Sequence, residues 1–182
     1  MATLDAGKDL CTAYIALGSN LGDKIAYLRS AIAGLGHLGN VPAVSSIYET
    51  APVGLVSQPD FLNAVVELQS RLEPAALLAA LLRIEQQHGR DRSASPPKGP
   101  RTLDLDLLAY DNLVLETPAL TLPHPSLAER RFVLAPLVEI APGWRHPILG
   151  KTAAQLLEEL EKADDCADTP AVRKISAPLK CS

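Results

Sequence analysis

Two aspartates one residue apart, Asp104 and Asp106, form the part of the chain best suited to chemistry. They alternate with leucines at positions 103, 105 and 107, and this period of two predicts a β-strand with both carboxylates on one face. Two like charges side by side destabilise a strand unless a positive charge lies between them. A magnesium ion fits that place, because it is commonly held by one or two carboxylates together with substrate phosphates. For two aspartates alone, a solvated acidic strand face is the more common alternative.

The segment before this strand concentrates positive charge. Between positions 83 and 101 the chain has a local balance of +3, although its overall net charge is −4. Its basic residues are Arg83, Arg90, Arg92, Lys98 and Arg101, and its acidic ones are Glu85 and Asp91. Residues 93–100 include three prolines and lack hydrophobic periodicity, which predicts a mobile cationic loop. Because arginine binds phosphate oxygens in pairs, a cationic loop beside an acidic strand indicates polyphosphate chemistry.

The chain has no Walker A motif for holding a nucleotide. The glycine-rich turn at residues 18–22 lacks the lysine followed by serine or threonine that ends such a loop. We interpret this turn as a connection between a strand and a helix, with Asp23 as a candidate helix cap. A bound nucleotide would therefore be held by arginines and metal ions.

Hydrophobic periodicity indicates which elements position these residues. It predicts strands at 11–17, 41–48, 61–68, 103–108 and 113–115, and helices at 23–35, 74–88, 132–140 and 152–162. Residues 49–60, which contain two prolines and a glycine, are predicted to form a loop. The central order β-α-β-β-α-β predicts an α+β fold of ferredoxin-like type, an antiparallel sheet with packed helices in α-β-α layers.

Composition limits the class of protein. The 182 residues, 47% of them hydrophobic, suffice for one full core, and we expect a single domain at 11–162 between a leader at 1–10 and a weakly ordered tail at 163–182. The sequence shows neither an apolar run of membrane-spanning length nor a secretory signal pattern. Cys11, Cys166 and Cys181 lack metal-binding spacing and are typical of reduced thiols. We therefore expect a cytoplasmic protein with a small anionic ligand and no nucleic-acid or membrane partner.

Six short strings together resemble the 6-hydroxymethyl-7,8-dihydropterin pyrophosphokinase family, over roughly residues 14–150. They are YIALGSNLGD at 14–23, TAPVG at 50–54, QPDFLN at 58–63, GPRTLDLD at 99–106, LPHP at 122–125 and RRFVL at 130–134. The string at 99–106 is highly specific, unlike a bare pair of aspartates. The resemblance implies transfer of the β,γ-diphosphate of ATP to the hydroxymethyl oxygen of the pterin, with release of AMP, in folate biosynthesis. We also expect a monomer.

The resemblance implies roles for individual residues on the nucleotide side. Asp104 and Asp106 would hold two magnesium ions that bridge ATP and the pterin hydroxyl, as in two-metal catalysis. Arg90 and Arg101 would neutralise phosphate charge during transfer, since a loose transition state depends on positioning and charge neutralisation. The implied ATP contacts are Glu85, Arg92, Lys98, Arg101, Thr121, His124 and Arg130. The alternatives are solvated surface charges for the arginines, an exposed helix position for Glu85 and a structural turn for His124.

A second group of residues suits the pterin. Phe61 and Asn63 lie two apart on a predicted strand and so share a face. An aromatic ring can stack on a flat bicyclic ligand while an amide pairs with its donor and acceptor edge. By resemblance, Phe132 supplies an opposing ring, and the backbone from Thr50 to Val53 helps to recognise the polar edge. Plain core packing is the alternative for both phenylalanines.

The chain departs from the family pattern just before residue 99. Many members have a basic residue and then a tryptophan there, whereas this chain has Pro97 and Lys98. Ala119 likewise stands where some members have an arginine. Two other functions remain open from the sequence: a catalytically silent module that binds nucleotide or pterin, and a metal-dependent phosphohydrolase.

Overall fold

The computed structural model describes residues 9–52, 58–90, 99–164, 172–175 and 179. The predicted site residues Val53, Arg92 and Lys98, and most of the predicted leader, lie outside these ranges. None of the helices in the described ranges is both long enough and apolar enough to cross a membrane.

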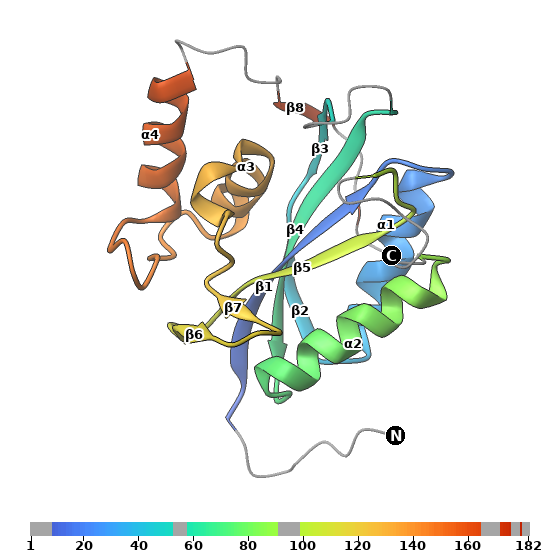
Figure 1. Ribbon diagram of the computed structural model, residues 1–182, viewed down its shortest axis with the longest axis horizontal. Helices are drawn as coiled ribbons and strands as arrows, with labels where there is room; N and C mark the ends of the chain where they lie inside the picture. The colour runs from blue at the N-terminus through green and yellow to red at the C-terminus, as the bar shows by residue number, and fades with distance from the viewer. Residues whose placement is uncertain (1–8, 53–57, 91–98, 165–171, 176–178, 180–182) are drawn as a thin grey trace.

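A six-stranded antiparallel sheet forms the centre of the molecule (Figure 1). Its strands are β1 (Cys11–Ser19), β2 (Asn40–Val44), β3 (Ile47–Thr50), β4 (Phe61–Ser70), β5 (Asp104–Tyr110) and β8 (Val172–Ile175). The spatial order is β5-β1-β4-β3-β8, and β2 also pairs with β4. The last strand of the β-α-β-β-α-β unit thus lies beside the first, which confirms the predicted ferredoxin-like fold.

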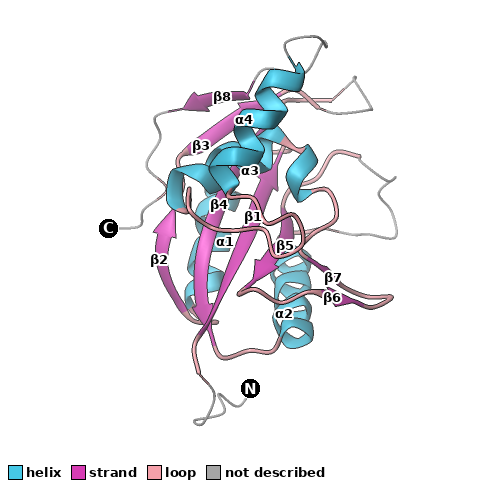
Figure 2. Ribbon diagram, turned by 90° about the vertical axis from the view of Figure 1, so that its left-hand side faces the viewer, coloured by secondary structure: helices cyan, strands magenta, loops and turns pink. Residues whose placement is uncertain are grey.

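Two pairs of helices cover the two faces of the sheet (Figure 2). Helices α1 (Lys24–Gly36) and α2 (Pro74–Gln87) lie on one face, and α3 (Arg131–Ile140) lies on the other, with α4 (Ala153–Asp164) packed against α3. Asp23 caps α1, as predicted, because its Oδ1 accepts a 3.0 Å hydrogen bond from the amide of Ala26. The predicted α-β-α layers are therefore present.

Each layer of helices buries its own apolar cluster against the sheet. Alternate residues of the strands divide between the clusters: Ile15 and Leu17 face α1 and α2, whereas Tyr14 faces α3. In β5, Leu105 belongs to the α1/α2 cluster, as the alternation of leucine and aspartate predicts. Asp104 and Asp106 consequently lie on the opposite face of the sheet.

The strand predicted at 41–48 is two strands, β2 and β3, which both pair with β4. Ser45 interrupts the ladder: its amide donates to the carbonyl of Val65 at 2.9 Å, and its hydroxyl accepts from the amide of Val65 at 2.9 Å. The segment from β2 to β3 thus contains one residue more than the part of β4 that it pairs with, and the pairing register with β4 shifts by one residue. The strand predicted at 113–115 is found only at Leu115, where β6 (Leu115–Glu116) begins and forms a short hairpin with β7 (Thr121–Leu122).

The C-terminal segment differs from the predicted weakly ordered tail at residues 172–175. These residues form β8, which pairs with β3 and places Val172 opposite Thr50 and Ile175 opposite Ile47. Four residues are too few for a periodic signal, and the strand is stabilised by pairing with a distant edge and by packing of Ile175 on the core. Leu179 is also buried in that core.

Candidate active site

The floor of the candidate site is a pair of rows that cross β5, β1 and β4. In one row Gly18 pairs with Asp104 on one side and Asn63 on the other. In the next row Ala16 pairs with Asp106 and Val65. A Cβ atom at position 18 would lie 3.4 Å from Asn63 Oδ1 and 3.7 Å from Asp104 Cβ. Because position 18 is a glycine, no side chain of β1 separates Asp104 from Asn63 in this row.

A cluster of arginines and carboxylates lies at the start of β5. Arg90, which follows α2, pairs through Nη1 with both Glu85 and Asp104. Arg101 Nη1 lies 2.6 Å from the other carboxylate oxygen of Asp104. Glu85 is 1% exposed, and its Oε1 accepts a 2.8 Å hydrogen bond from the amide of Leu105. Glu85 is thus no exposed helix residue: it fixes Arg90 to the backbone of β5.

Asp106 lies in a partly desolvated position beside a second negative charge. Burial, followed by the charge of Asp104, raises its pKa, while His124, Arg130 and Arg90 act in the opposite direction. Burial lowers the pKa of His124, and Asp106 opposes that shift. The amide of Ser126 donates to His124 Nδ1 at 3.2 Å, so in the neutral ring Nε2 carries the proton. The structure thus brings His124, Arg130 and Arg90 around the two aspartates.

This donor set fits a magnesium ion that shares its coordination with a substrate. Within the described ranges, no group of three or more His, Cys, Asp or Glu residues could hold a metal by itself. The chain offers two carboxylates on one strand face, and the repulsion that raises the pKa of Asp106 would be relieved by a cation between them. Magnesium commonly takes one or two carboxylates and completes its shell with phosphate oxygens and water.

The side chains predicted for the pterin lie on the same face, beyond Gly18. Asn63 and Thr50 are buried, and Asn63 Nδ2 donates to Thr50 Oγ1 at 2.8 Å. Phe61 is half-buried, with the Arg101 guanidinium carbon 5.9 Å from its ring centroid. This contact joins the predicted pterin wall to the arginine cluster.

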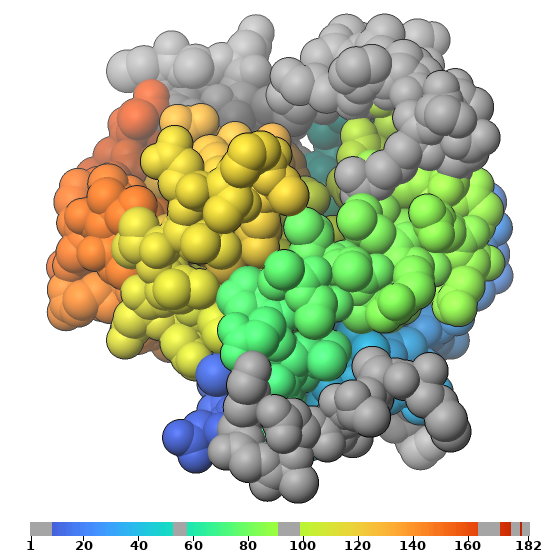
Figure 3. Space-filling model, turned by 60° about the horizontal axis from the view of Figure 1, so that its bottom comes forward, coloured from blue at the N-terminus to red at the C-terminus, as the bar shows by residue number. Residues whose placement is uncertain are grey.

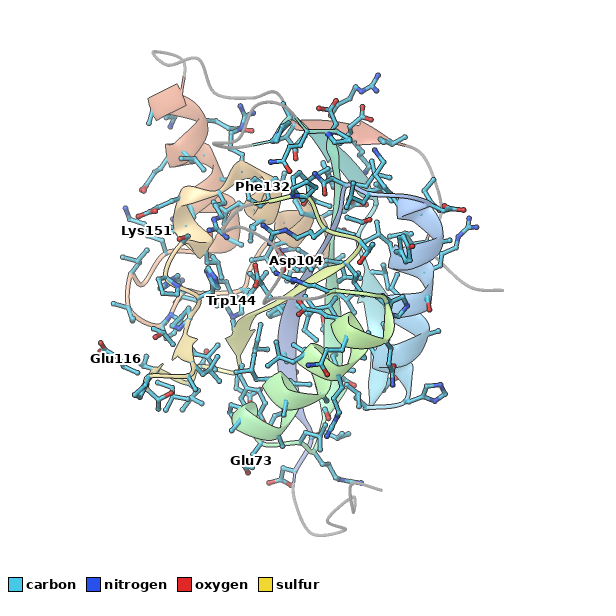
Figure 4. The ribbon with its side chains drawn as sticks, turned by 45° about the vertical axis from the view of Figure 1, so that its right-hand side comes forward. Glu73, Asp104, Glu116, Phe132, Trp144 and Lys151 are labelled. Atoms are coloured by element: carbon cyan, nitrogen blue, oxygen red, sulfur yellow. The ribbon has the colours of Figure 1, made fainter. Side chains whose placement is uncertain are left out.

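Phe132 lies in the first turn of α3, on the other side of the site (Figure 4). The guanidinium carbon of Arg130 is 5.8 Å from the centroid of its ring. In the space-filling view a hollow opens between the gold segment that leads into α3 and the yellow-green residues that lead into β5 (Figure 3). Thr121 is half-buried in β7, opposite Glu116 and three residues before His124.

The sequence interpretation did not assign a site role to Asn20. The pattern at 18–22 predicts an ordinary connection, yet Asn20 is 1% exposed and pairs with the backbone of Arg101. A polar amide in a glycine-rich turn was the available signal. Its partners are 38 to 81 residues away, so no local pattern could identify them.

Comparisons with known proteins agree with this geometry. Residues 14–142 match the family described as 7,8-dihydro-6-hydroxymethylpterin-pyrophosphokinase (HPPK). A 2-amino-4-hydroxy-6-hydroxymethyldihydropteridine pyrophosphokinase of Bacillus subtilis (strain 168) is 51% identical over 130 residues, which cover 70% of this chain and 77% of that protein. One of Haemophilus influenzae is 44% identical over 134 residues, covering 72% and 82%.

Solved structures show the same fold. A Plasmodium falciparum HPPK-DHPS crystal structure with pterin and p-hydrobenzoate matches with a TM-score of 0.69 at 15% identity. The match covers 91% of this chain but 47% of that longer chain. Because the family match spans most of the chain and includes the strands, arginines and aspartates that build the site, the chain belongs to the 7,8-dihydro-6-hydroxymethylpterin-pyrophosphokinase family of enzymes.

Proposed function

We propose that this enzyme transfers the β,γ-diphosphate of ATP to the hydroxymethyl oxygen of 6-hydroxymethyl-7,8-dihydropterin, in a magnesium-dependent step of folate biosynthesis that releases AMP. One observation carries the proposal: Asp104 and Asn63 flank Gly18, which has no side chain, in a single row of the sheet. A metal-binding carboxylate and a pterin-binding amide are thereby neighbours on one surface. Phosphate and acceptor would meet between them.

Asp104 and Asp106 would hold the two magnesium ions, which would neutralise phosphate charge and polarise the attacking and leaving oxygens. Both carboxylate oxygens of Asp104 contact arginines in this structure. With a cation bound to Asp104, Arg90 and Arg101 would be available to pair with phosphate oxygens. They would thus lie beside the phosphates whose charge they are proposed to neutralise during transfer.

The pterin half of the proposal rests on Asn63 and the two phenylalanines. Asn63 Nδ2 is occupied by Thr50 Oγ1, which leaves Oδ1, on the side of Gly18, to accept from a pterin N–H group. Phe61 and Phe132 offer aromatic faces for a flat ring. The Arg101 guanidinium carbon lies 5.9 Å from the centroid of the Phe61 ring, so the proposed pterin site adjoins the arginine cluster.

Analysis of nucleotide products tests the proposal directly. Purified protein is incubated with ATP and magnesium, with and without 6-hydroxymethyl-7,8-dihydropterin. AMP and the pterin diphosphate are expected only when pterin and magnesium are both present. Release of ADP or free phosphate without pterin would instead indicate a kinase or a phosphohydrolase. Binding of ATP without any turnover would indicate the silent binding module.

Some substrate contacts in the proposal rest on the resemblance to the family. Those of Arg92, Lys98 and Val53 remain predictions of this kind, because these residues lie outside the described ranges. The ATP contacts of Glu85, Thr121, His124 and Arg130 are part of the same prediction. A cytoplasmic location and a monomeric state also remain predictions from the sequence.

A further inference from the structure

Asn20, in the connection between β1 and α1, is a buried side chain whose polar atoms are all bonded to other loops. It is 1% exposed. Its Oδ1 accepts one hydrogen bond and its Nδ2 donates two, to segments that flank opposite sides of the candidate site. A buried amide that uses both its oxygen and its nitrogen in this way is held in one orientation.

One set of Asn20 hydrogen bonds, which we call its first arm, holds Arg101 in place. The amide of Arg101 donates to Asn20 Oδ1 at 2.7 Å, and the amide of Asn20 donates to the carbonyl of Arg101 at 3.1 Å. These two bonds continue the pairing of β1 with β5 beyond the last strand pair, Gly18 with Asp104. With its backbone held there, Arg101 reaches Asp104 at 2.6 Å.

A second set of Asn20 hydrogen bonds, its second arm, holds the segment that precedes Phe61. Asn20 Nδ2 donates to the carbonyl of Pro59 at 3.2 Å and to Gln58 Oε1 at 3.0 Å. Lys24 Nζ supports the same segment by donating to the carbonyl of Asp60 at 3.0 Å. Phe61 begins β4 directly afterwards.

Arg101 and Phe61, which the two arms hold, contact each other at the site. The guanidinium carbon of Arg101 lies 5.9 Å from the centroid of the Phe61 ring. We propose that Asn20 is a positioning residue that sets the separation between the phosphate-binding arginine and the pterin-binding ring. This inference deepens the proposed function and rests on it. Asn20 touches neither substrate in this proposal: it acts through Arg101 and Phe61.

A fixed separation matters because transfer needs the pterin oxygen and the phosphorus atom in attacking distance. A displacement of about 1 Å in such a geometry can lower a rate about 100-fold. Each substrate has further contacts of its own, so the binding of either one alone depends much less on Asn20. The expected signature is therefore a loss in the rate of transfer that exceeds the loss in each separate affinity.

Two substitutions separate the arms. Asn20→Ala removes the side-chain bonds of both arms and leaves only the backbone bond from residue 20 to the carbonyl of Arg101, whereas Asn20→Asp keeps an oxygen for the amide of Arg101 and loses the donor to residues 58 and 59. The matched controls are Asn40→Ala and Asn40→Asp. Asn40 is exposed on β2, where its Nδ2 donates to Gln69 Oε1 at 3.3 Å, far in the sheet from β5.

Hydrogen–deuterium exchange of the protein without substrates gives a readout that does not depend on activity. Asn20→Ala should speed exchange in peptides covering 58–62 and 99–104, and Asn20→Asp only in 58–62, with the rest of the sheet unchanged. The Asn40 variants should change neither peptide. Unchanged exchange in both peptides would overturn the proposal, and so would faster exchange throughout the sheet in both Asn20 variants, which would make Asn20 a general folding residue.

Single-turnover formation of AMP and separate titrations with ATP and with pterin complete the test. We expect the rate constant at saturation to fall on the order of 100-fold in Asn20→Ala and about 10-fold in Asn20→Asp, with each separate Kd changed by less than about threefold. A rate within about twofold of wild type in Asn20→Ala would overturn the inference. Absence of AMP from the wild-type protein would instead refute the proposed function, and the exchange data would still decide whether Asn20 holds both segments.

Discussion

The two faces of the same three strands have opposite compositions. On the face toward α1 and α2, Leu17 pairs with Leu105 and Ala64 in one apolar row, and all three are at most 1% exposed. One residue further along, on the other face, Gly18 pairs with Asp104 and Asn63. The first row is filled by side chains and stabilises the fold. The second has a glycine at its centre and two polar groups at its ends, so it is suited to bind a polar substrate.

The polar face is itself divided along the strands. Near Tyr14 and Leu108 it is covered by apolar residues of α3, including Val133 and Leu137. Gly18 and its partners Asp104 and Asn63 are not part of this apolar cluster. The contrast indicates that a site arises on this sheet where a helix stops and small strand residues follow. Substitutions on the two faces should therefore separate stability from activity.

The largest effect is expected for Asp106→Ala, on the polar face. Turnover should fall by at least about 1000-fold, because each lost carboxylate contact to a metal dication removes several kcal/mol of transition-state stabilisation. The free energy of unfolding should stay equal or rise, since the substitution removes a buried charge from beside Asp104. Single-turnover AMP formation and urea unfolding measure the two quantities.

Glu116→Ala is the control for Asp106→Ala, because Glu116 is an exposed carboxylate on β6. It should alter neither turnover nor stability. Asp104→Ala should also abolish turnover with the fold intact. Activity near the wild-type level in either aspartate variant would refute the assignment of the aspartates as metal ligands. It would also refute the proposal that the polar face of the sheet carries the reaction.

The opposite result is expected for Leu105→Ala, which lies between the two aspartates but faces the core. Leu105 is 1% exposed, so its truncation should lower the free energy of unfolding by about 3 kcal/mol. The folded fraction should keep its kcat, because the change lies on the other side of the sheet. Urea unfolding followed by activity at low temperature checks both. A loss of kcat comparable to that of Asp106→Ala would show that the faces are not independent.

The division between the faces was predictable from the sequence because it is a local property of β5. Alternation of leucine and aspartate over five residues, 103–107, determines which side each residue occupies. The interruption at Ser45 and the strand β8 were not predictable in this way. Both depend on pairing with a distant strand. At Ser45, the side-chain hydroxyl takes the place of a backbone acceptor for the amide of Val65. In β8, four residues pair with the edge strand β3.

The short strings suggested residues for the candidate site, but they did not predict the contacts among those residues. The resemblance indicated Arg90, Arg101 and Glu85 as separate nucleotide contacts. The structure shows one cluster in which Glu85 orients Arg90 and both arginines contact Asp104. Asn20 escaped detection because an amide with three remote partners has no sequence period. Hydrophobic periodicity shows which face of a strand a residue occupies. Contacts between residues on different strands can be identified only from the folded structure.

Within the polar face, Asn63→Ala should separate the pterin end from the nucleotide end. We expect the Kd for the pterin to rise about 10- to 100-fold, because the Oδ1 acceptor proposed for a pterin N–H group is lost together with the hydrogen bond to Thr50 that orients it. The Kd for ATP should change by less than about twofold, since Asp104 and the arginines are untouched. Fluorescence titration of each ligand measures both values. Equal losses for pterin and ATP would place Asn63 outside the pterin pocket.

The smallest effect concerns Glu139, on the α3 helix that borders the polar face. It accepts hydrogen bonds from the amide of Ser46 at 3.1 Å, from Ser46 Oγ at 2.8 Å and from Tyr48 Oη at 2.9 Å, and Lys174 Nζ lies 3.2 Å away. Burial acts to raise its pKa, but these donors outweigh burial, and the pKa is lowered from its usual 4.5. Glu139→Gln should cost about 1 kcal/mol of stability at pH 7.

The pH dependence of that loss distinguishes a charge effect from a packing effect. A carboxyl whose pKa is lowered by folding stabilises the protein fully above its unfolded pKa, and this stabilisation is lost as the pH falls through the folded value. The difference between wild type and Glu139→Gln in urea unfolding should therefore shrink below pH 4.5. Glu159→Gln, which removes an exposed ion pair with Lys151, should leave the free energy of unfolding almost unchanged both at pH 7 and below pH 4.5. A Glu139 effect that stays constant with pH would mean that α3 is held beside the site by packing, with the anion contributing little.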